Sequence, residues 1–90
     1  MKAMKEAMAG SLESSDVLVT ISPREGAGVE YTIESIVIKQ YGRRIRSVTE
    51  EVAAAAGLSG AAVRVQDRGA LECTLRARLE TALERAAAGP

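Results

Sequence analysis

Three short segments of the chain alternate apolar and polar side chains with the two-residue period of a β-strand. Val17 to Ile21 and Val29 to Glu34 show the pattern most clearly, and Ala61 to Gln66 repeats it. A loop that contains Pro23 and Gly26 joins the first two segments. We therefore expect these two strands to form an antiparallel pair with one buried face and one solvated face.

Two longer segments repeat apolar residues every three or four positions, which predicts two amphipathic helices. The first is expected from an N-cap at Ser35 to about Ala56, where Gly57 supplies a stop. The second is expected from Leu71 to Ala88, before the final Gly89-Pro90 pair. The positions expected to face the core are Val37, Tyr41, Ile45, Val48, Val52 and Ala55 in the first helix, and Leu71, Leu75, Leu79, Ala82, Leu83 and Ala86 in the second.

The order of these elements predicts an α+β fold in a single domain over residues 1–90. We expect a small antiparallel or mixed sheet of three to four strands, covered on one face by the two helices. Residues 1–9 fit two alternatives: a flexible segment, or an extra strand that completes a hairpin across residues 13–16. The element order is then β-β-(β)-α-β-α.

Charge and composition argue against several kinds of partner. The chain has 12 basic and 12 acidic side chains, so its net charge gives no reason to expect nucleic acid or an anionic membrane as a partner. Arg43, Arg44 and Arg46 form a local excess of positive charge, but the predicted sheet has no aromatic pair for base stacking. No apolar stretch has the length of a signal peptide core or a membrane span. We expect a cytoplasmic protein.

The sequence lacks the residues that independent catalysis needs. It contains no His, which removes the commonest general base and the usual metal-site spacings. Cys73 is the single cysteine; without a neighbouring base, we interpret it as a residue on the flank of a helix. Gly26-Ala27-Gly28 lacks the third glycine and the helix start of a dinucleotide fingerprint. The chain is therefore expected not to be an enzyme by itself, and to have no metal site.

A small polar cluster, Glu13-Ser14-Ser15-Asp16, precedes the first clear strand and is predicted to form a turn. Ser and Asp need no function to explain their presence in a turn, because they hydrogen-bond the local backbone. A turn tip also holds a hydroxyl where a modifying enzyme can reach it. Spacing alone leaves both explanations open for Ser14.

Two stretches of the chain resemble the acyl carrier (gamma) subunit of citrate lyase. The first runs from Ala9 to Val17 and contains the polar turn. The second runs from Asp67 to Cys73 and continues through Leu75 to Glu80. Between them, Lys39-Gln40-Tyr41-Gly42 is similar to the family's helix start, where Phe often replaces Tyr. The similarity spans nearly the whole chain.

This resemblance implies that a transferase attaches 2'-(5''-phosphoribosyl)-3'-dephospho-coenzyme A to Ser14 through a phosphodiester, with Ser15 as the competing site. The arm's thiol then holds an acetyl group as a thioester. The alpha subunit of citrate lyase (an acyl transferase) exchanges acetyl for citryl, and the beta subunit (a citryl lyase) splits off oxaloacetate. Ser11 stands where Thr is common, and Gln66-Asp67-Arg68-Gly69 replaces a more usual Asp-Asp-Lys-Gly. Neither departure touches Ser14.

Other interpretations compete with this one. The carrier subunit of malonate decarboxylase bears a similar arm in a Gly-Ser-Gly-Asp-like turn, but Leu12 to Asp16 and Gly69 to Cys73 favour citrate lyase. From a different class, an unmodified protein- or RNA-interaction domain also fits the element order. Arg76 and Arg78 fit either a role in docking or in gripping the arm's phosphates, or a solvated helix face.

Overall fold

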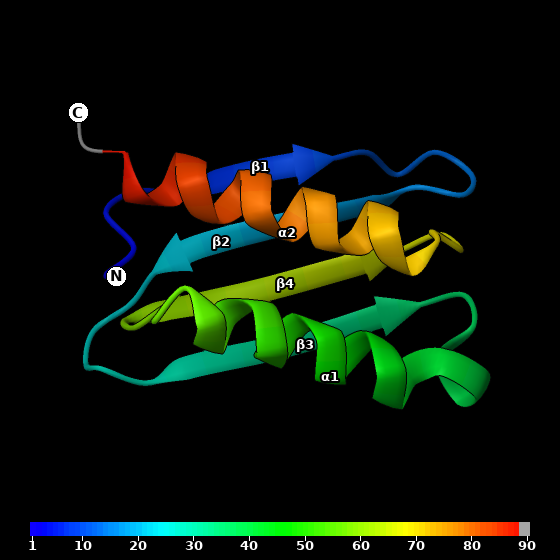
Figure 1. Ribbon diagram of the computed structural model, residues 1–90, viewed down its shortest axis with the longest axis horizontal. Helices are drawn as coiled ribbons and strands as arrows, with labels where there is room; N and C mark the ends of the chain where they lie inside the picture. Colours follow the sequence, from blue (N-terminus) through cyan, green and yellow to red (C-terminus); the bar gives the residue numbers. More distant parts are fainter. Residues whose placement is uncertain (89–90) are drawn as a thin grey trace.

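The computed structural model describes residues 1–88 and confirms the α+β class. Its elements follow the order β-β-β-α-β-α. They are β1 (Ala7–Gly10), β2 (Val17–Pro23), β3 (Val29–Ser35), α1 (Ile38–Ala55), β4 (Ala61–Asp67) and α2 (Glu72–Ala87) (Figure 1). The expected stop at Gly89-Pro90 lies outside the described residues.

The four strands form one mixed sheet in the order β1-β2-β4-β3. The expected pairing of β2 with β3 is wrong, because β4 lies between them. It is antiparallel to β2, with Val63 opposite Ile21, and parallel to β3, with Val63 opposite Tyr31. A helical crossover is long enough to return the chain parallel to β3, and α1 provides it. Strand β4, whose valines are buried, thereby lies inside the sheet, while the half-buried β3 lies at its edge.

The strand alternative is the one observed near the N-terminus. Residues Ala7–Gly10 pair antiparallel with β2, so that Ala9 lies opposite Val19. Ala3 is also buried, at 2% exposure, and Lys2 bridges to Ser59 beyond the end of α1. The hairpin β1–β2 places the polar cluster of residues 13–16 at its tip, as expected.

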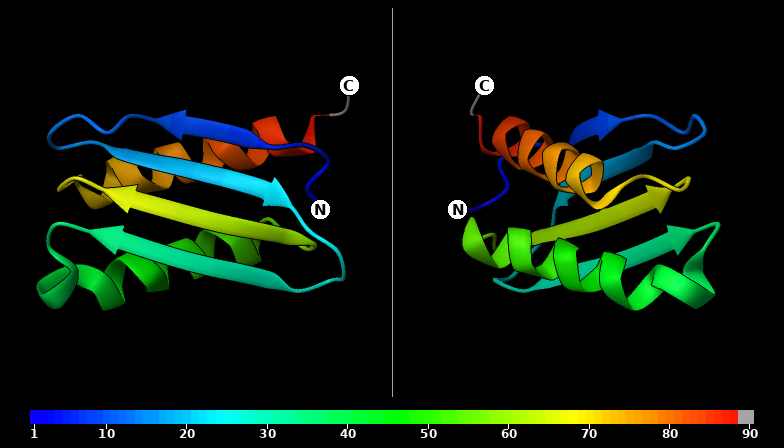
Figure 2. Two further views of the ribbon diagram at one scale, coloured as in Figure 1. Left: turned by 180° about the vertical axis from the view of Figure 1, so that it is seen from behind. Right: turned by 45° about the vertical axis from the view of Figure 1, so that its right-hand side comes forward.

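Both helices cover the same face of the sheet, and the opposite face is bare (Figures 1 and 2). The core between sheet and helices is wholly aliphatic, in keeping with a chain that has no Phe or Trp. Its largest contributors are Val17, Val19, Ile21, Ile45, Val48, Val52, Val63, Val65, Leu75, Leu79 and Leu83. This arrangement leaves the ends of the strands, rather than a face of the sheet, as the place where loops gather.

Helix α1 begins two residues later than expected, because its N-cap is Val37 and not Ser35. Ser35 ends β3, and its Oγ accepts a hydrogen bond from the Val37 backbone N–H at 3.0 Å while donating to the Asp67 carboxylate at 2.8 Å. The Ser35 side chain thus stabilises the turn that precedes α1 and does not cap the helix. The expected stop at Gly57 is confirmed: its φ is +66°, the left-handed conformation in which glycine carries no steric cost.

The apolar stripes of both helices are confirmed except at Tyr41 and Ala55 of α1 and at Leu71 before α2, and the stripe of α2 stays buried as far as Ala86. Tyr41 is 59% exposed and Leu71 is 72% exposed, and Ala55 is exposed as well. Helix α1 begins beyond the end of β3, so its first turn has no sheet beneath it (Figure 1). Leu71 has extended backbone angles as the N-cap of α2, which takes it out of the helical repeat.

Candidate functional site

Ser14 lies at the exposed tip of the β1–β2 hairpin. The turn is closed by a hydrogen bond from the Asp16 backbone N–H to the Glu13 carbonyl at 3.1 Å, and Ser14 and Ser15 are its central residues. Ser15 has φ +65°, the positive value that the second central residue of a type II turn requires. Within residues 1–88 the Ser14 hydroxyl has no protein hydrogen-bond partner, so it is free to be modified.

The carboxylate of Asp16 holds this turn in place. One oxygen accepts from the Ser11 hydroxyl at 2.7 Å and the other from the Val17 backbone N–H at 2.7 Å. The Arg78 guanidinium, from α2, donates to both oxygens at 3.1 and 3.3 Å. The Ser11 and Val17 hydrogen bonds, reinforced by Arg78, lower the pKa of Asp16 to about 2. The carboxylate is therefore ionised at any ordinary pH.

Gly10 makes the contact between Arg78 and Asp16 possible. Its φ is +96°, and a Cβ atom built on it would lie 1.8 Å from the Val17 carbonyl oxygen and 3.2 Å from Cδ of Arg78. Only a residue without a side chain lets the strand turn this closely while the arginine stem passes over it. Gly10 and Asp16 thus belong to one supporting structure beneath Ser14.

Backbone hydrogen bonds tie the same turn to the β4–α2 connection. The Ser15 N–H donates to the Arg68 carbonyl at 2.8 Å, and the Arg68 N–H donates to the Asp16 carbonyl at 2.9 Å. The neighbouring Asp67 is 5% exposed and accepts from Ser35 Oγ and from the backbone N–H groups of Gly69 and Ala70 at 3.2 and 3.0 Å. Three connections are therefore fastened together at the end of the sheet that carries Ser14.

The two stretches that prompted the sequence resemblance, residues 9–17 and 67–80, meet in space through these contacts. Arg78 pairs with Asp16. Arg76 pairs with Glu51 at 2.6 Å and with Glu72 at 3.3 Å, the second contact being an i,i+4 pair within α2. Both arginines thus make ion pairs within the fold, while their side chains stay 35% and 42% exposed. A role of either arginine in docking or in gripping the arm's phosphates stays a prediction.

Arg68 is the basic residue beside Ser14 that the sequence did not single out. Its side chain is exposed, and within residues 1–88 it makes no ion pair. The sequence shows Arg68 only as part of a short Asp-Arg-Gly turn. Its closeness to the Ser14 turn became visible only when the structure placed the two turns side by side. The backbone of Arg68 is hydrogen-bonded to Ser15 and Asp16, next to Ser14 in the turn.

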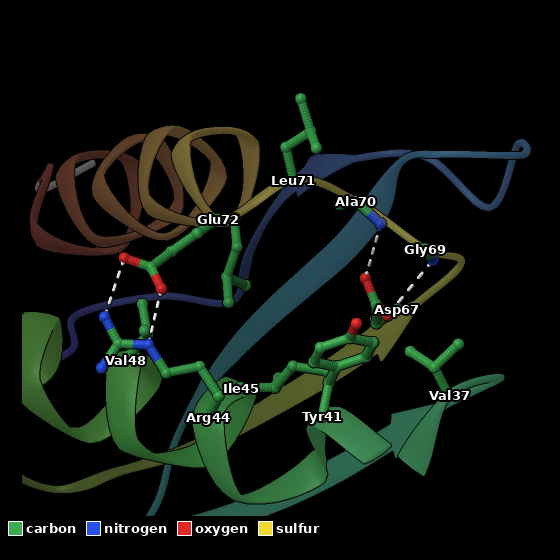
Figure 3. A pocket seen from close by; sticks show the side chains of 11 residues that line it. Val37, Tyr41, Arg44, Ile45, Val48, Asp67, Gly69, Ala70, Leu71 and Glu72 are labelled. Carbon is green, nitrogen blue, oxygen red and sulfur yellow. Dashed lines mark hydrogen bonds and ion pairs between the residues drawn. The ribbon is translucent and has the colours of Figure 1, made fainter. Parts of the chain in front are cut away.

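A groove of about 470 Å³ lies on the helix side of the same end, which we call the helix groove (Figure 3). A bidentate ion pair between Arg44 and Glu72, at 2.6 and 3.0 Å, joins α1 to α2 along it. Its lining is Val37, Tyr41, Arg44, Ile45, Val48, Asp67, Gly69, Ala70, Leu71, Glu72 and Leu75. The pairing of Arg44, and of Arg46 with Glu50, accounts for two of the three arginines in the local basic run.

The remaining candidates for chemistry are unremarkable in their surroundings. Cys73 is exposed on the first turn of α2 and does not line the helix groove. Gly26 has open space around it, as a loop residue would. None of the helices within residues 1–88 has both the length and the apolarity to cross a bilayer.

Comparison with known proteins identifies the class of this small domain as an acyl carrier protein. A family model described as "ACP: Malonate decarboxylase delta subunit (MdcD)" matches residues 4–86. A solved Pseudomonas malonate decarboxylase hetero-tetramer, in complex with malonate, contains a chain of the same fold. The TM-score is 0.82 at 20% identity, with 93% of this chain and 86% of that chain covered.

Curated sequences narrow the class further: the chain belongs to the citrate lyase acyl carrier protein family. It is 48% identical over 87 residues to citrate lyase acyl carrier protein 2 of Salmonella typhimurium, covering 97% of this chain and 90% of the relative. It is 52% identical over 86 residues to the Serratia proteamaculans protein, covering 96% and 84%. With the Streptococcus mutans protein it shares 47% over 87 residues, covering 97% and 85%.

Proposed function

We propose that this chain is the acyl carrier subunit of a citrate lyase complex, acting as one domain over residues 1–90 and carrying its prosthetic group on Ser14. The observation that carries this proposal is the free Ser14 hydroxyl, held at an exposed turn by the Asp16 network. The family membership supports the citrate lyase complex as its setting.

The residues around Ser14 fit a phosphodiester-linked group. A hydroxyl without a hydrogen-bond partner among residues 1–88 supplies the oxygen for the ester bond. Arg68, whose backbone is hydrogen-bonded to Ser15 and Asp16, brings an exposed positive charge to the same end of the sheet as the negative charge of the ester. Ser15 is the weaker candidate, because its positive φ makes it the strained residue of the turn. The group proposed is 2'-(5''-phosphoribosyl)-3'-dephospho-coenzyme A, attached by a dedicated transferase.

The chain's own contribution is presentation rather than bond-making. A thiol at the end of the arm supplies thioester chemistry, while this domain fixes one end of the arm and so raises its effective concentration at the active sites of its partners. Those partners are the acyl transferase (alpha) and citryl lyase (beta) subunits, which act on citrate to give oxaloacetate and acetate. We place the complex in the cytoplasm.

A malonate decarboxylase-type carrier is the second candidate, favoured by the family model and by the solved hetero-tetramer of the same fold. The relatives at 47–52% identity all favour citrate lyase over it. Co-purification decides between them: a citrate lyase carrier retains the alpha and beta subunits of that enzyme when isolated from cells growing on citrate, and a malonate decarboxylase carrier does not.

The modification itself is tested by intact mass. Protein from cells that make the complex should show a mass increment on the peptide containing Ser14, and Ser14→Ala should abolish it without lowering the melting temperature. Ser15→Ala is the matched control and should be loaded like the wild type. An unmodified wild-type chain, or loading that survives in Ser14→Ala and is lost in Ser15→Ala, would contradict the assignment.

A further inference from the structure

The end of the domain that carries Ser14 exposes five large apolar side chains; Met4 and Met8 are the other two exposed among the described residues. Leu12, Ile36 and Ile38 are 46%, 65% and 46% exposed there, and Tyr41 and Leu71 are 59% and 72% exposed. The last two lie on either side of the helix groove, one from α1 and one from the β4–α2 connection (Figure 3). Exposed apolar surface of this kind commonly marks a site that binds a ligand or a partner.

We propose that the helix groove is the resting site of the arm on Ser14, and that it takes the uncharged distal part, the pantetheine chain with its thiol. This inference rests on the proposed function, because it needs the arm to be present. It adds a binding site on the carrier itself, for a ligand of stated chemistry.

The attachment point and the groove are neighbours through Arg68. The paired hydrogen bonds between Arg68 and the Ser15–Asp16 backbone continue the β2–β4 ladder, in which Val17 lies opposite Asp67. Directly opposed residues of such a ladder have Cα atoms about 4.5–5.5 Å apart. The groove begins on both sides of Arg68, at Asp67 and Gly69. An arm on Ser14 therefore has only to cross one turn of chain to enter it.

The charges of the groove select which part of the arm enters. Glu72 neutralises Arg44, and the Asp67 carboxylate already accepts hydrogen bonds from Ser35, Gly69 and Ala70. The groove lining therefore offers phosphates no unpaired cation, whereas Arg68, next to the turn and outside that lining, makes no ion pair within residues 1–88. The distal part of the arm carries no phosphate and consists of methylenes, two amides and a thiol.

The size and walls of the groove suit that segment. Its volume of about 470 Å³ lies in the range of about 300–1,000 Å³ that is usual for small-molecule clefts. Seven of its lining residues present aliphatic or aromatic carbon, namely Val37, Tyr41, Ile45, Val48, Ala70, Leu71 and Leu75. Packing the methylenes against Tyr41 and Leu71 would cover two side chains that are otherwise exposed.

Two measurements on protein with Cys73→Ser, which removes the competing exposed thiol, test the proposal. The first compares backbone amide chemical shifts of the loaded and unloaded protein. Shifts are expected at Gly69, Ala70 and Glu72 and on α1 near Tyr41, as well as around Ser14. Intact mass of the same sample reports whether the arm is attached.

The second measurement is the alkylation rate of the arm's thiol. The double variant Tyr41→Ala with Leu71→Ala removes the groove's exposed walls and should raise the rate several-fold. Leu12→Ala with Ile36→Ala is the matched control: both residues are similarly exposed at the same end, but they line a separate hollow. This control should leave the rate unchanged.

The outcomes separate the two proposals. A serine that stays unmodified in cells making the complex overturns the proposed function and this inference together. A loaded Ser14 with shifts confined to residues 11–17 and Arg68, or equal alkylation rates in both double variants, overturns the resting site and leaves the carrier function standing. Shifts along the groove with a rate that rises only in Tyr41→Ala with Leu71→Ala establish it.

Discussion

Two exposed loops of this sheet show how differently a turn can be held. The β1–β2 loop, residues 11–16, is fastened by side chains, since the Asp16 carboxylate accepts hydrogen bonds from Ser11, Val17 and Arg78. The β2–β3 loop, residues 24–28, is held by backbone hydrogen bonds to Gly60 and by one exposed ion pair from Arg24 to Glu30. Both loops are polar in sequence, and only the first is anchored to a helix.

The difference matters because the first loop is the proposed attachment site. A serine that carries a long arm benefits from a fixed base, since the position of the arm's free end depends on the orientation of its anchor. Residues 24–28 have no proposed attachment site, so this loop needs only to connect its two strands. Comparing the loops thus distinguishes a turn that connects strands from one that is proposed to present a group.

The largest expected effect comes from Gly10, which ends β1 just before the first loop, and is judged against Gly26 in the second loop. Gly10→Ala should cost about 3 kcal/mol, the sum of about 1–2 kcal/mol for a left-handed backbone and a similar penalty for overlap with the Val17 carbonyl. Gly26→Ala is the matched control, because Gly26 also has positive φ but has no atom within 4 Å of a Cβ. It should cost only about 1 kcal/mol. Urea unfolding measures both, and equal losses would contradict the close contact assigned to Gly10.

Asp16→Asn should destabilise the domain in a pH-dependent way. The folded-state pKa of Asp16 is about 2, below the ordinary 3.8, so its contribution to stability is complete above about pH 4 and is lost as pH falls toward 2. The gap in unfolding free energy between wild type and Asp16→Asn should therefore be widest near neutrality and close on acidification. A gap that stays constant down to about pH 2 would show that the charge of Asp16 is not what holds the turn.

Ser15→Gly should stabilise the protein by about 1 kcal/mol, since glycine adopts the φ of +65° without the steric cost that serine bears. Thermal unfolding measures the gain, and intact mass should show that Ser14 is still loaded. Ser14→Gly serves as the control and should give no gain, because the positive φ belongs to Ser15. A destabilised Ser15→Gly would mean that the Ser15 side chain contributes something beyond its backbone conformation.

The smallest effect is expected in the β2–β3 loop. Glu30→Gln removes the ion pair with Arg24, whose partners are 46% and 62% exposed, and should cost less than about 0.5 kcal/mol. It should leave the loading of Ser14 unchanged. A loss as large as that of Asp16→Asn would abolish the distinction between the two loops.

Much of the fold was predictable from local patterns, and the errors have definite causes. Alternation in residues 29–34 and 61–66 predicted β3 and β4, and the three- and four-residue repeat predicted both helices. Tyr41 and Leu71 fit that repeat but are exposed, because periodicity identifies a face and not what lies beneath it. The same limit applies to Ser35, which looks like a helix cap until Asp67 is found beside it.

The position of the serine turn was predictable from the sequence, whereas the residues that hold the turn in place were not. Ser14 in a polar turn was evident from residues 13–16 alone, and the turn is where it was expected. The roles of Arg68, Arg76 and Arg78 were not, because three arginines close together in sequence look alike until their partners are known. One pairs with Asp16, one joins α1 to α2, and one is left unpaired among the described residues.

The sequence by itself determined which segments of this protein become strands and helices, and where its exposed serine turn falls. Those properties depend on side-chain period and turn chemistry within a few neighbouring residues. Only the tertiary structure decided that β4 enters between β2 and β3, that Arg78 reaches Asp16, and that a groove opens beside Ser14. Each of these depends on packing between residues far apart in the chain, and the free energy of such contacts is not encoded at any single position.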